Sequence, residues 1–355
     1  MKNFFSKFGF ALNIGTAFLL LLSYLAPIVP PDYFWPLSFF GLAYLYLVLI
    51  NVIFLVIWIL QRSRRLLLPL LAILIGFNHI TNTFQLFPAS ELKSKGVKIL
   101  SYNVHIFRYD LITNKTNNPK ILDYFKSSGA DIICLQEATL LKTGKLSPKG
   151  IKDAVPGINF YQLASSSSST GSITFSKYPI VNLGEIRFAG SENLVIFSDI
   201  KVSNHQTIRV YNCHFQSYSI DPDDYTIIDS PGSGSDSKQI LEAKKISYKL
   251  KIGLELRAFQ ARKVADHIRK SPYPVIVCGD FNDTPVSYAY RKVRGDLKDA
   301  FVESGWGISN TYNGKLPSFR IDYILYNQKF AVGEYKRDRV NFSDHFPIHC
   351  ELSFE

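Results

Sequence analysis

The stretch Val275-Ile276-Val277-Cys278-Gly279-Asp280-Phe281-Asn282 joins an apolar run to a glycine and two polar side chains. A short run rich in β-branched residues and bounded by glycine is typical of a buried strand, so we predict a strand over residues 275–278. Asp280 and Asn282 follow this strand, at a place where side chains can face a cleft above a sheet. A carboxylate and an amide in such a place are suited to a divalent metal ion and to phosphate oxygens.

The same combination of an apolar run with a polar end recurs from Val97 onward. Asn103 ends the first run, Gln136-Glu137 ends the next, and Asn212-Cys213-His214 ends another. Short strand-like runs that alternate with helical segments indicate an α/β domain. Strands are predicted over residues 97–104, 131–136, 172–176, 194–202, 207–213, 275–278 and 321–326, and helices over 120–127 and 244–270.

Six polar motifs thus stand in order between residue 97 and the C-terminus. They are Asn103, Gln136-Glu137, Asn212-Cys213-His214, Gly279-Asp280-Phe281-Asn282, Arg320-Ile321-Asp322-Tyr323 and Ser343-Asp344-His345. In kind and order this set resembles the endonuclease/exonuclease/phosphatase superfamily, which includes DNase I, apurinic endonucleases, neutral sphingomyelinases and inositol polyphosphate 5-phosphatases. The resemblance covers residues 97–355. It implies a two-sheet, four-layer α/β sandwich of the DNase I-like type and a metal-dependent phosphoester hydrolase.

On the metal side, the resemblance makes Glu137 the main ligand, with Asn103 and Asp344 as further contacts to the ion, directly or through water. The expected cofactor is Mg²⁺ (or Mn²⁺), because these ions take oxygen ligands and keep several waters.

On the acid–base side, Asp280 is placed to orient or deprotonate the attacking water. His345 is expected either as the general base or as a hydrogen-bond donor in the transition state, because imidazole titrates near neutral pH, and Asp322 would hold its ring. His214 would contact the phosphate or assist the leaving oxygen. The side-chain amides expected to bind phosphate are those of Asn282, Asn103 and Asn212.

The remaining histidines and the cysteines are interpreted as structural. His105 stands close to Asn103 but is taken to be a structural residue, as are His205, His267 and His349. No two cysteines are closely spaced, so neither a zinc site nor a CxxC motif is indicated. All four lie in apolar runs and are predicted to be buried free thiols, namely Cys134, Cys213, Cys278 and Cys350.

Residues 1–90 have a different composition. Three stretches, 8–31, 34–60 and 66–87, carry no Asp, Glu, Lys or Arg. Each is long enough to cross a bilayer, which takes roughly 20 apolar residues. We therefore predict an all-α transmembrane region of three helices as a membrane anchor over 1–90, a linker over 91–96 and a catalytic domain over 97–355. The alternative is a signal peptide followed by core helices.

Basic residues set the expected orientation. Lys2 and Lys7 precede the first stretch, and Arg62, Arg64 and Arg65 lie between the second and third. The positive-inside rule places these residues in the cytoplasm, so three crossings leave the catalytic domain on the extracytoplasmic or periplasmic side. The expected location is the cell (inner) membrane, with a multi-pass anchor in contact with membrane lipid.

Net charge and the details of two motifs bear on the substrate class. The formal net charge is +11, which suits an anionic partner. Asn212-Cys213-His214 departs from the tyrosine-centred motif of apurinic endonucleases, and residues 279–285 look closer to the sphingomyelinase-like and general phosphodiesterase branches. A phosphodiester substrate is expected, either a lipid head group or nucleic acid, and no protein partner. The favoured function is a membrane-anchored phosphodiesterase acting on lipid-linked phosphate, with an extracytoplasmic endo- or exonuclease and a non-catalytic phosphate-binding module as alternatives.

Overall fold

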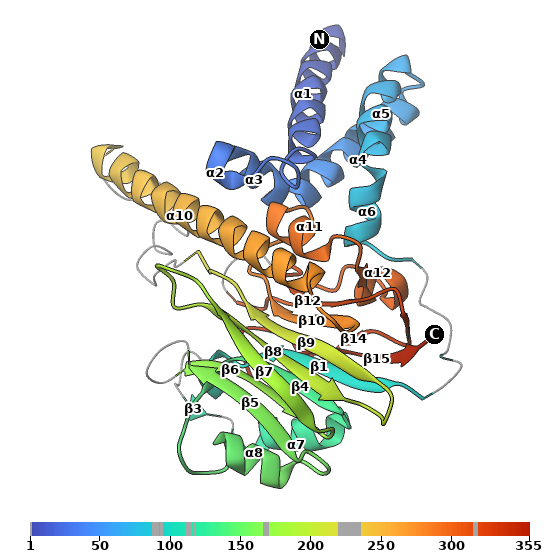
Figure 1. Ribbon diagram of the computed structural model, residues 1–355. Coiled ribbons are helices and arrows are strands. Elements are labelled where there is room, and N and C mark those ends of the chain that lie inside the picture. The colour runs from blue at the N-terminus through green and yellow to red at the C-terminus, as the bar shows by residue number, and fades with distance from the viewer. Residues whose placement is uncertain are drawn as a thin grey trace. The chain divides into compact units, whose positions relative to one another are not determined.

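The chain forms two compact units in a computed structural model (Figure 1), which describes residues 2–86, 92, 95–110, 115–116, 118–165, 170–218, 236–314 and 319–355. The helical unit comprises Met1–Asn82, Gln216–Phe259 and Thr284–Lys292. The sheet unit comprises Thr83–Phe215, Gln260–Asp283 and Val293–Glu355. Gln216–Phe259 and Thr284–Lys292 follow the predicted linker at 91–96 in the sequence, but they group with the N-terminal helices.

The first sheet of the sheet unit has seven strands in the order β13-β15-β1-β4-β6-β5, with β14 also paired to β15. β1 and β4 are parallel, and the other pairs are antiparallel. The strands are β1 (Val97–Asn103), β4 (Ile132–Thr139), β5 (Phe160–Ser165), β6 (Thr170–Ser176), β13 (Phe330–Val332), β14 (Lys336–Arg337) and β15 (Ile348–Phe354).

The second sheet has six strands in the order β11-β12-β10-β9-β8-β7. β9 and β10 are parallel, and the other pairs are antiparallel. The strands are β7 (Ile180–Arg187), β8 (Leu194–Lys201), β9 (Thr207–His214), β10 (Val275–Asp280), β11 (Lys298–Asp299) and β12 (Asp322–Tyr326). A separate hairpin pairs β2 (Arg108–Asp110) with β3 (Lys115–Thr116).

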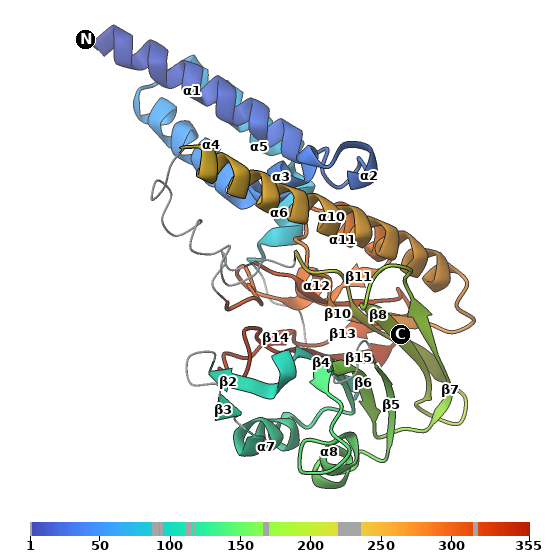
Figure 2. The same ribbon diagram turned by 90° about the vertical axis from the view of Figure 1, so that its left-hand side faces the viewer.

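The two sheets stack face to face, and helices cover their outer faces (Figure 2). Apolar side chains of both sheets, such as Ile99 and Ile276, meet in one buried core. On the outer face of the first sheet, α7 (Asn118–Ser128) and α8 (Pro148–Ala154) contribute to a second core. On the second sheet, the end of α10 (Asp236–Arg269) brings His267 against β9, where its Nδ1 lies 2.8 Å from the hydroxyl of Tyr211. The predicted two-sheet, four-layer α/β sandwich is confirmed.

The sequence-predicted elements of the sheet unit are all present. The seven predicted strands occur with ends that differ by no more than three residues, and α7 and α10 correspond to the two predicted helices. Two further short helices are α11 (Tyr288–Arg294) and α12 (Ala300–Ser304). The four cysteines are free and buried, as predicted.

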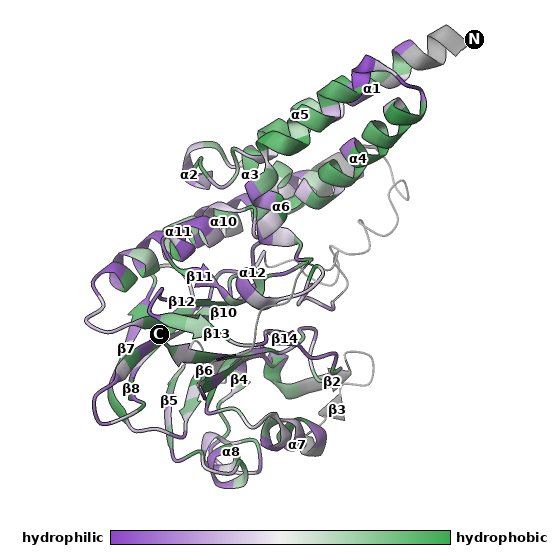
Figure 3. Ribbon diagram, turned by 90° about the vertical axis from the view of Figure 1, so that its right-hand side faces the viewer, coloured by the Kyte–Doolittle hydropathy of each residue, from purple (hydrophilic) through white to green (hydrophobic). Residues whose placement is uncertain are grey.

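The helical unit begins with α1 (Lys2–Ser23) and continues with helices that divide the second and third predicted spans. Figure 3 shows that α1, α4 and α5 are hydrophobic over most of their length. The remaining elements of residues 2–83 are α2 (Pro31–Phe34), α3 (Pro36–Leu42), α4 (Tyr44–Leu60), the 3₁₀ turn η1 (Arg64–Leu66), α5 (Leu67–Ile75) and α6 (Phe77–Thr83).

Both divisions lie at or beside glycines that another segment approaches closely. A Cβ on Gly41 would lie 2.3 Å from the carbonyl oxygen of Val286, and one on Gly76 would lie 2.1 Å from the ring of Tyr24. The helix axes bend there by 61° and 62°. In the described part of the chain no helix taken alone has the length and apolar composition to cross a bilayer, whereas the two bent pairs, 36–60 and 64–83, meet that criterion jointly.

Candidate active site

Strand register brings the polar strand ends together at one edge of the sandwich. Asn103 lies opposite Gln136 in the parallel pair of β1 and β4. Asp280 lies opposite His214 in the parallel pair of β9 and β10, and opposite Asp322 on β12. Since parallel strands end at the same edge of a sheet, this topology gathers residues from distant parts of the sequence at that edge.

Glu137 enters the site through an irregularity in β4. The register with β6 shifts between Leu135 and Ala138, and Glu137 has a left-handed backbone with φ of 50°. A bulge of this kind redirects a side chain, and such bulges are frequent beside active sites. The bulge lets Glu137 join the polar residues at this edge directly after the buried Gln136.

Three polar groups surround the Glu137 carboxylate. Its Oε1 atom accepts a hydrogen bond of 3.0 Å from the Asn103 amide and lies 3.3 Å from Nε2 of His214, and its Oε2 atom lies 3.5 Å from Nδ1 of His105. Burial alone would raise the pKa of this carboxyl, but hydrogen bonds from His105 and His214 outweigh burial and hold the pKa well below its usual value. Glu137 is therefore charged near neutral pH.

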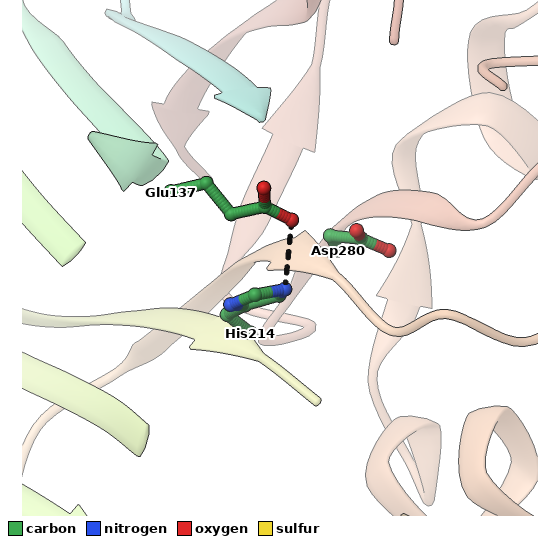
Figure 4. A group of neighbouring side chains, drawn as sticks. All are labelled: Glu137, His214 and Asp280. Atoms are coloured by element: carbon green, nitrogen blue, oxygen red, sulfur yellow. Dashed lines mark ion pairs between the residues drawn. The ribbon is translucent and has the colours of Figure 1, made fainter. Parts of the chain in front are cut away.

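Glu137, His214 and Asp280 converge closely enough to hold a metal ion (Figure 4). One ligand atom from each of the three side chains lies within 4.8 Å of the others. Two carboxylates and an imidazole form a donor set that divalent ions accept. Asp280 also belongs to a second such group, with Asp322 and His345. The residues present thus fit a divalent cation.

Asp280 is the most connected carboxylate of the site. It is buried, its Oδ2 atom accepts a hydrogen bond of 2.9 Å from the Asn103 amide, and its Oδ1 atom accepts one of 2.7 Å from the backbone N–H of Asn282. Nε2 of His345 lies 3.7 Å from Oδ2. Burial raises the pKa of Asp280 to about 6, against the opposing effect of His345. A carboxylate in this position accepts a proton more readily than an ordinary aspartate.

His345 and Asp322 form the predicted pair. Nδ1 of His345 lies 2.9 Å from Oδ2 of Asp322, and both side chains are buried. Burial disfavours the imidazolium, but the charges of Asp322 and Asp280 outweigh it and raise the pKa of His345 well above its usual value. The Tyr312 ring also packs against His345 in a T-shaped arrangement, with 5.4 Å between ring centroids. The ring is therefore held in one orientation, with Nε2 towards Asp280.

Asn282 lies beside Asp280 in a strained backbone conformation. Its φ is 53°, and its side-chain amide donates to the carbonyl oxygen of Phe215 at 3.0 Å and to Oδ2 of Asp280 at 3.2 Å. Left-handed backbone at a residue other than glycine costs free energy and occurs frequently at functional sites. The two hydrogen bonds hold this amide beside Asp280.

Asn212 differs from its predicted role as a phosphate contact. It is fully buried, and its amide nitrogen donates to the carbonyl oxygens of Leu135 and Ile173 at 3.1 and 3.0 Å. Its Oδ1 atom accepts a hydrogen bond of 2.8 Å from Gln136. Both ends of the amide are thus occupied inside the core, so Asn212 holds the two sheets together and does not face substrate.

Two residues of the site were not predicted. His105 was interpreted as structural, but its Nδ1 atom lies 3.5 Å from Glu137 and 3.5 Å from Oδ1 of Asp344. It is through His105 that the predicted metal contact Asp344 connects to Glu137. Asn193 approaches His214, with 3.4 Å between Nδ2 and the His214 Nδ1 atom. The sequence signal for His105 was its place two residues after Asn103; no comparable signal marks Asn193.

Comparison with known proteins agrees with this geometry. Residues 100–345 match the sequence model described as the Endonuclease/Exonuclease/phosphatase family. The chain belongs to this family. It is therefore a phosphoester hydrolase by kind, and its acidic residues could hold the divalent metal that is typical of the Endonuclease/Exonuclease/phosphatase family. Residues 3–83 match a domain of unknown function (DUF8431). No curated protein matches the chain.

Solved structures of low sequence identity share the fold. An endonuclease/exonuclease/phosphatase from Beutenbergia cavernae is 16% identical with a TM-score of 0.52, over 74% of this chain and 72% of that chain. A family protein from Bacteroides thetaiotaomicron is 18% identical with a TM-score of 0.51, over 74% and 97%. The human nocturnin catalytic domain is 17% identical with a TM-score of 0.50, over 75% and 96%. At such identities these likenesses show the fold alone.

The contrast between Asn212 and Asn282 gives a testable prediction. Asn212→Leu leaves the buried carbonyls of Leu135 and Ile173 without their donor, so we expect a loss of about 2–4 kcal/mol in the free energy of unfolding. Asn282→Gly removes the amide beside Asp280 while glycine tolerates the left-handed backbone, so we expect nearly unchanged stability and a rate lower by about 100-fold. Thermal unfolding and phosphodiesterase assays on both variants would check this. Equal effects of the two variants on stability would contradict the assignment.

Proposed function

We propose that this chain is a membrane-anchored phosphodiesterase that depends on Mg²⁺ (or Mn²⁺), belongs to the sphingomyelinase-like branch of its family and acts on lipid-linked phosphate. The observation that carries the proposal is the convergence of Glu137, His214 and Asp280 beside the His345–Asp322 pair. A cation site next to a buried imidazole–carboxylate pair provides both charge stabilisation and proton handling for one phosphate centre.

Each side chain has a definite task in the proposed reaction. Glu137, with Asn103 and Asp344 as neighbours, would hold the ion, which supplies positive charge to the phosphoryl oxygens when bound. Asp280 would orient the attacking water and accept its proton, as its pKa of about 6 permits.

The phosphate itself would be bound by hydrogen-bond donors. Nε2 of a protonated His345 would donate to a phosphate oxygen, while Asp322 keeps the proton on Nδ1. The Asn282 amide, oriented by the carbonyl of Phe215, would exchange its 3.2 Å hydrogen bond to Asp280 for one to a second phosphate oxygen. His214 would contact the phosphate or the leaving oxygen. Donors fixed in place before the reaction stabilise the charge that develops on the phosphorus centre.

The proposed substrate is a lipid head group because of the composition of the helical unit. Its exposed surface includes the side chains of Phe18, Leu49, Ile53 and Leu71, each of which is at least half exposed. An apolar surface of this kind fits lipid better than water. The second candidate is an extracytoplasmic nuclease, which the net charge of +11 favours because nucleic acid is a polyanion.

Substrate and metal can be tested together on the purified chain. We expect hydrolysis of sphingomyelin or phosphoinositide vesicles with Mg²⁺ and no cleavage of plasmid DNA. Glu137→Gln keeps the shape of the side chain but removes its charge. Loss of a residue that only supports a metal ligand lowers metal affinity roughly 10–100-fold. Because Glu137 is expected to bind the ion itself, the Mg²⁺ concentration for half-maximal rate should rise by at least this factor. Glu185→Gln, in the exposed ion pair with Arg187, is the matched control. Rapid plasmid cleavage with untouched lipid would favour the nuclease.

The pH dependence tests the protonation state of His345. Because neighbouring carboxylates raise the pKa of His345, the protonated donor persists above neutral pH and its loss should set the alkaline limb of kcat/KM. Asp322→Asn removes the largest of the effects that raise this pKa, so the His345 pKa falls and the alkaline limb should move to lower pH. The measurement is a pH–rate profile of both proteins. An unchanged alkaline limb with a displaced acid limb would make His345 the general base.

We further propose that residues 1–90 are a multi-pass anchor in the cell (inner) membrane, with the catalytic domain at 97–355 on the extracytoplasmic side. The bent helix pairs 36–60 and 64–83 support this by length and composition, and the basic residues at 62, 64 and 65 support the orientation. Alkaline phosphatase fused to the C-terminus should be active in a bacterial host, because the enzyme matures only outside the cytoplasm. A fusion active instead after Ser63, and silent at the C-terminus, would reverse the topology.

A further inference from the structure

The first part of α10, up to Phe259, belongs to the helical unit, and one of its faces is packed. Leu254 is buried, and a Cβ on Gly253 would lie 3.0 Å from the carbonyl oxygen of Ser217. Arg257 is fully buried and donates through Nε to the carbonyl oxygen of Gln216 at 2.9 Å. The packed side of this helix therefore faces residues 216–217 of the same unit.

The opposite face carries an apolar stripe open to solvent. Leu241, Tyr248 and Ile252 are 55%, 63% and 39% exposed. Their spacings of seven and four residues place them within a narrow sector of an α-helix, because 3.6 residues make one turn. In a helix that packs one face on its own unit, the outer face is ordinarily polar. On α10 the centre of the outer face is apolar instead.

Lysines border the stripe on both sides. At 100° per residue, Lys244 and Lys251 fall on one flank and Lys245 on the other. Lys244 and Lys245 are exposed, and Lys251 lies 3.8 Å from Glu255. By the same spacing Glu255, the partner of Lys251, lies at the border of the stripe on the Lys244 side. An apolar centre with a lysine excess at its flanks is the composition of helices that lie in the interface of a membrane, where the apolar side chains enter the acyl boundary and the ammonium groups meet lipid phosphates.

We propose that this face of α10, formed by Leu241, Tyr248 and Ile252 with Lys244, Lys245 and Lys251, lies on an anionic lipid surface. Charge complementarity favours anionic over zwitterionic lipid, and α10 shares a compact unit with the apolar helices of residues 2–82. Nucleic acid fits this face less well, since aliphatic side chains occupy its centre and a polyanion is bound chiefly by cationic contacts. The inference rests on the proposed membrane attachment, and it assigns a second, peripheral contact.

The test uses the full-length chain with Tyr248→Cys, labelled with an environment-sensitive fluorophore. The four native cysteines are buried and should remain unlabelled. The chain is placed in nanodiscs of phosphatidylcholine alone or of an equal mixture with phosphatidylglycerol, with and without brominated acyl chains as quenchers. Val181→Cys, an exposed position on β7 in the sheet unit, is the matched control.

We expect the label at position 248 to shift to the blue and to be quenched by brominated lipid in the mixed nanodiscs, weakly in phosphatidylcholine alone, and the label at 181 to be unaffected in both. Each lysine near an anionic surface contributes about 1 kcal/mol, or about fivefold, so Lys244→Glu, Lys245→Glu and Lys251→Glu together should lower the ratio of docked to undocked helix by at least roughly 100-fold.

Three outcomes would overturn the inference, and they are distinguishable. A chain that co-purifies with the mixed nanodiscs but shows no quenching at 248 contradicts the lipid-facing role of α10 and leaves the anchor intact. A label that responds to single-stranded DNA and not to lipid assigns the face to nucleic acid. A chain that does not co-purify with nanodiscs contradicts the membrane attachment itself, and the inference falls with it.

Discussion

The geometry of the site depends on side-chain amides that hydrogen-bond across the gap between the two sheets. At the edge, Asn103 on the first sheet donates to Asp280 on the second at 2.9 Å and to Glu137 on its own sheet at 3.0 Å. Deeper in the core, Gln136 donates to Asn212 across the same gap at 2.8 Å. Buried amides that lost these partners would each cost 1–3 kcal/mol, so the bonds fix the spacing and register of the sheets. Because the metal-binding group draws Glu137 from one sheet and Asp280 from the other, it exists only at that spacing.

Backbone strain accompanies this arrangement. Glu137 and Asn282, the residues expected at the ion and at the phosphate, both have left-handed φ angles. Gly279 has a φ of 134°, and a Cβ there would lie 2.0 Å from the carbonyl oxygen of Cys213. At Glu137 and Asn282 such conformations cost about 1–3 kcal/mol each and persist where the surroundings determine them. For Asn282 the hydrogen bonds to Asp280 and Phe215 do so. The glycine of the Gly279–Asn282 motif is thus required by the close approach of β9, whatever its neighbours do in catalysis.

Sequence patterns predicted the central strands well because these strands are buried on both faces and read as continuous apolar runs. Strands β5 and β7 were missed because they lie at the sheet edges, and the exposed Leu163, Val181 and Leu183 there do not form an apolar run of recognisable period. The sequence predicted which residues form the site and which strands they end, but it did not predict how deeply each side chain lies in the sandwich. Asn212 and His214 share a face of β9, yet Asn212 pairs with Cys278 inside the core and His214 with Asp280 at the edge. Alternation along a strand gives the face of a side chain, and only the register with neighbouring strands gives its depth.

The same distinction applies to the apolar helices. Hydropathy measures composition and therefore predicted three spans. It takes no account of the close packing at Gly41 and Gly76, where the second and third predicted spans are divided into bent helix pairs. The chain also enters the helical unit at two later points, directly after Phe215 and Asp283. These points follow His214 and Asn282, which end two of the polar motifs of the site. The segments that continue from the catalytic strands are thus the segments that group with the apolar helices. In a sandwich whose strands are held rigidly, substrate choice depends on the segments that follow the strand ends. We therefore expect the determinants of substrate choice in the segments that begin at Gln216 and Thr284, and not in the polar motifs that define the family.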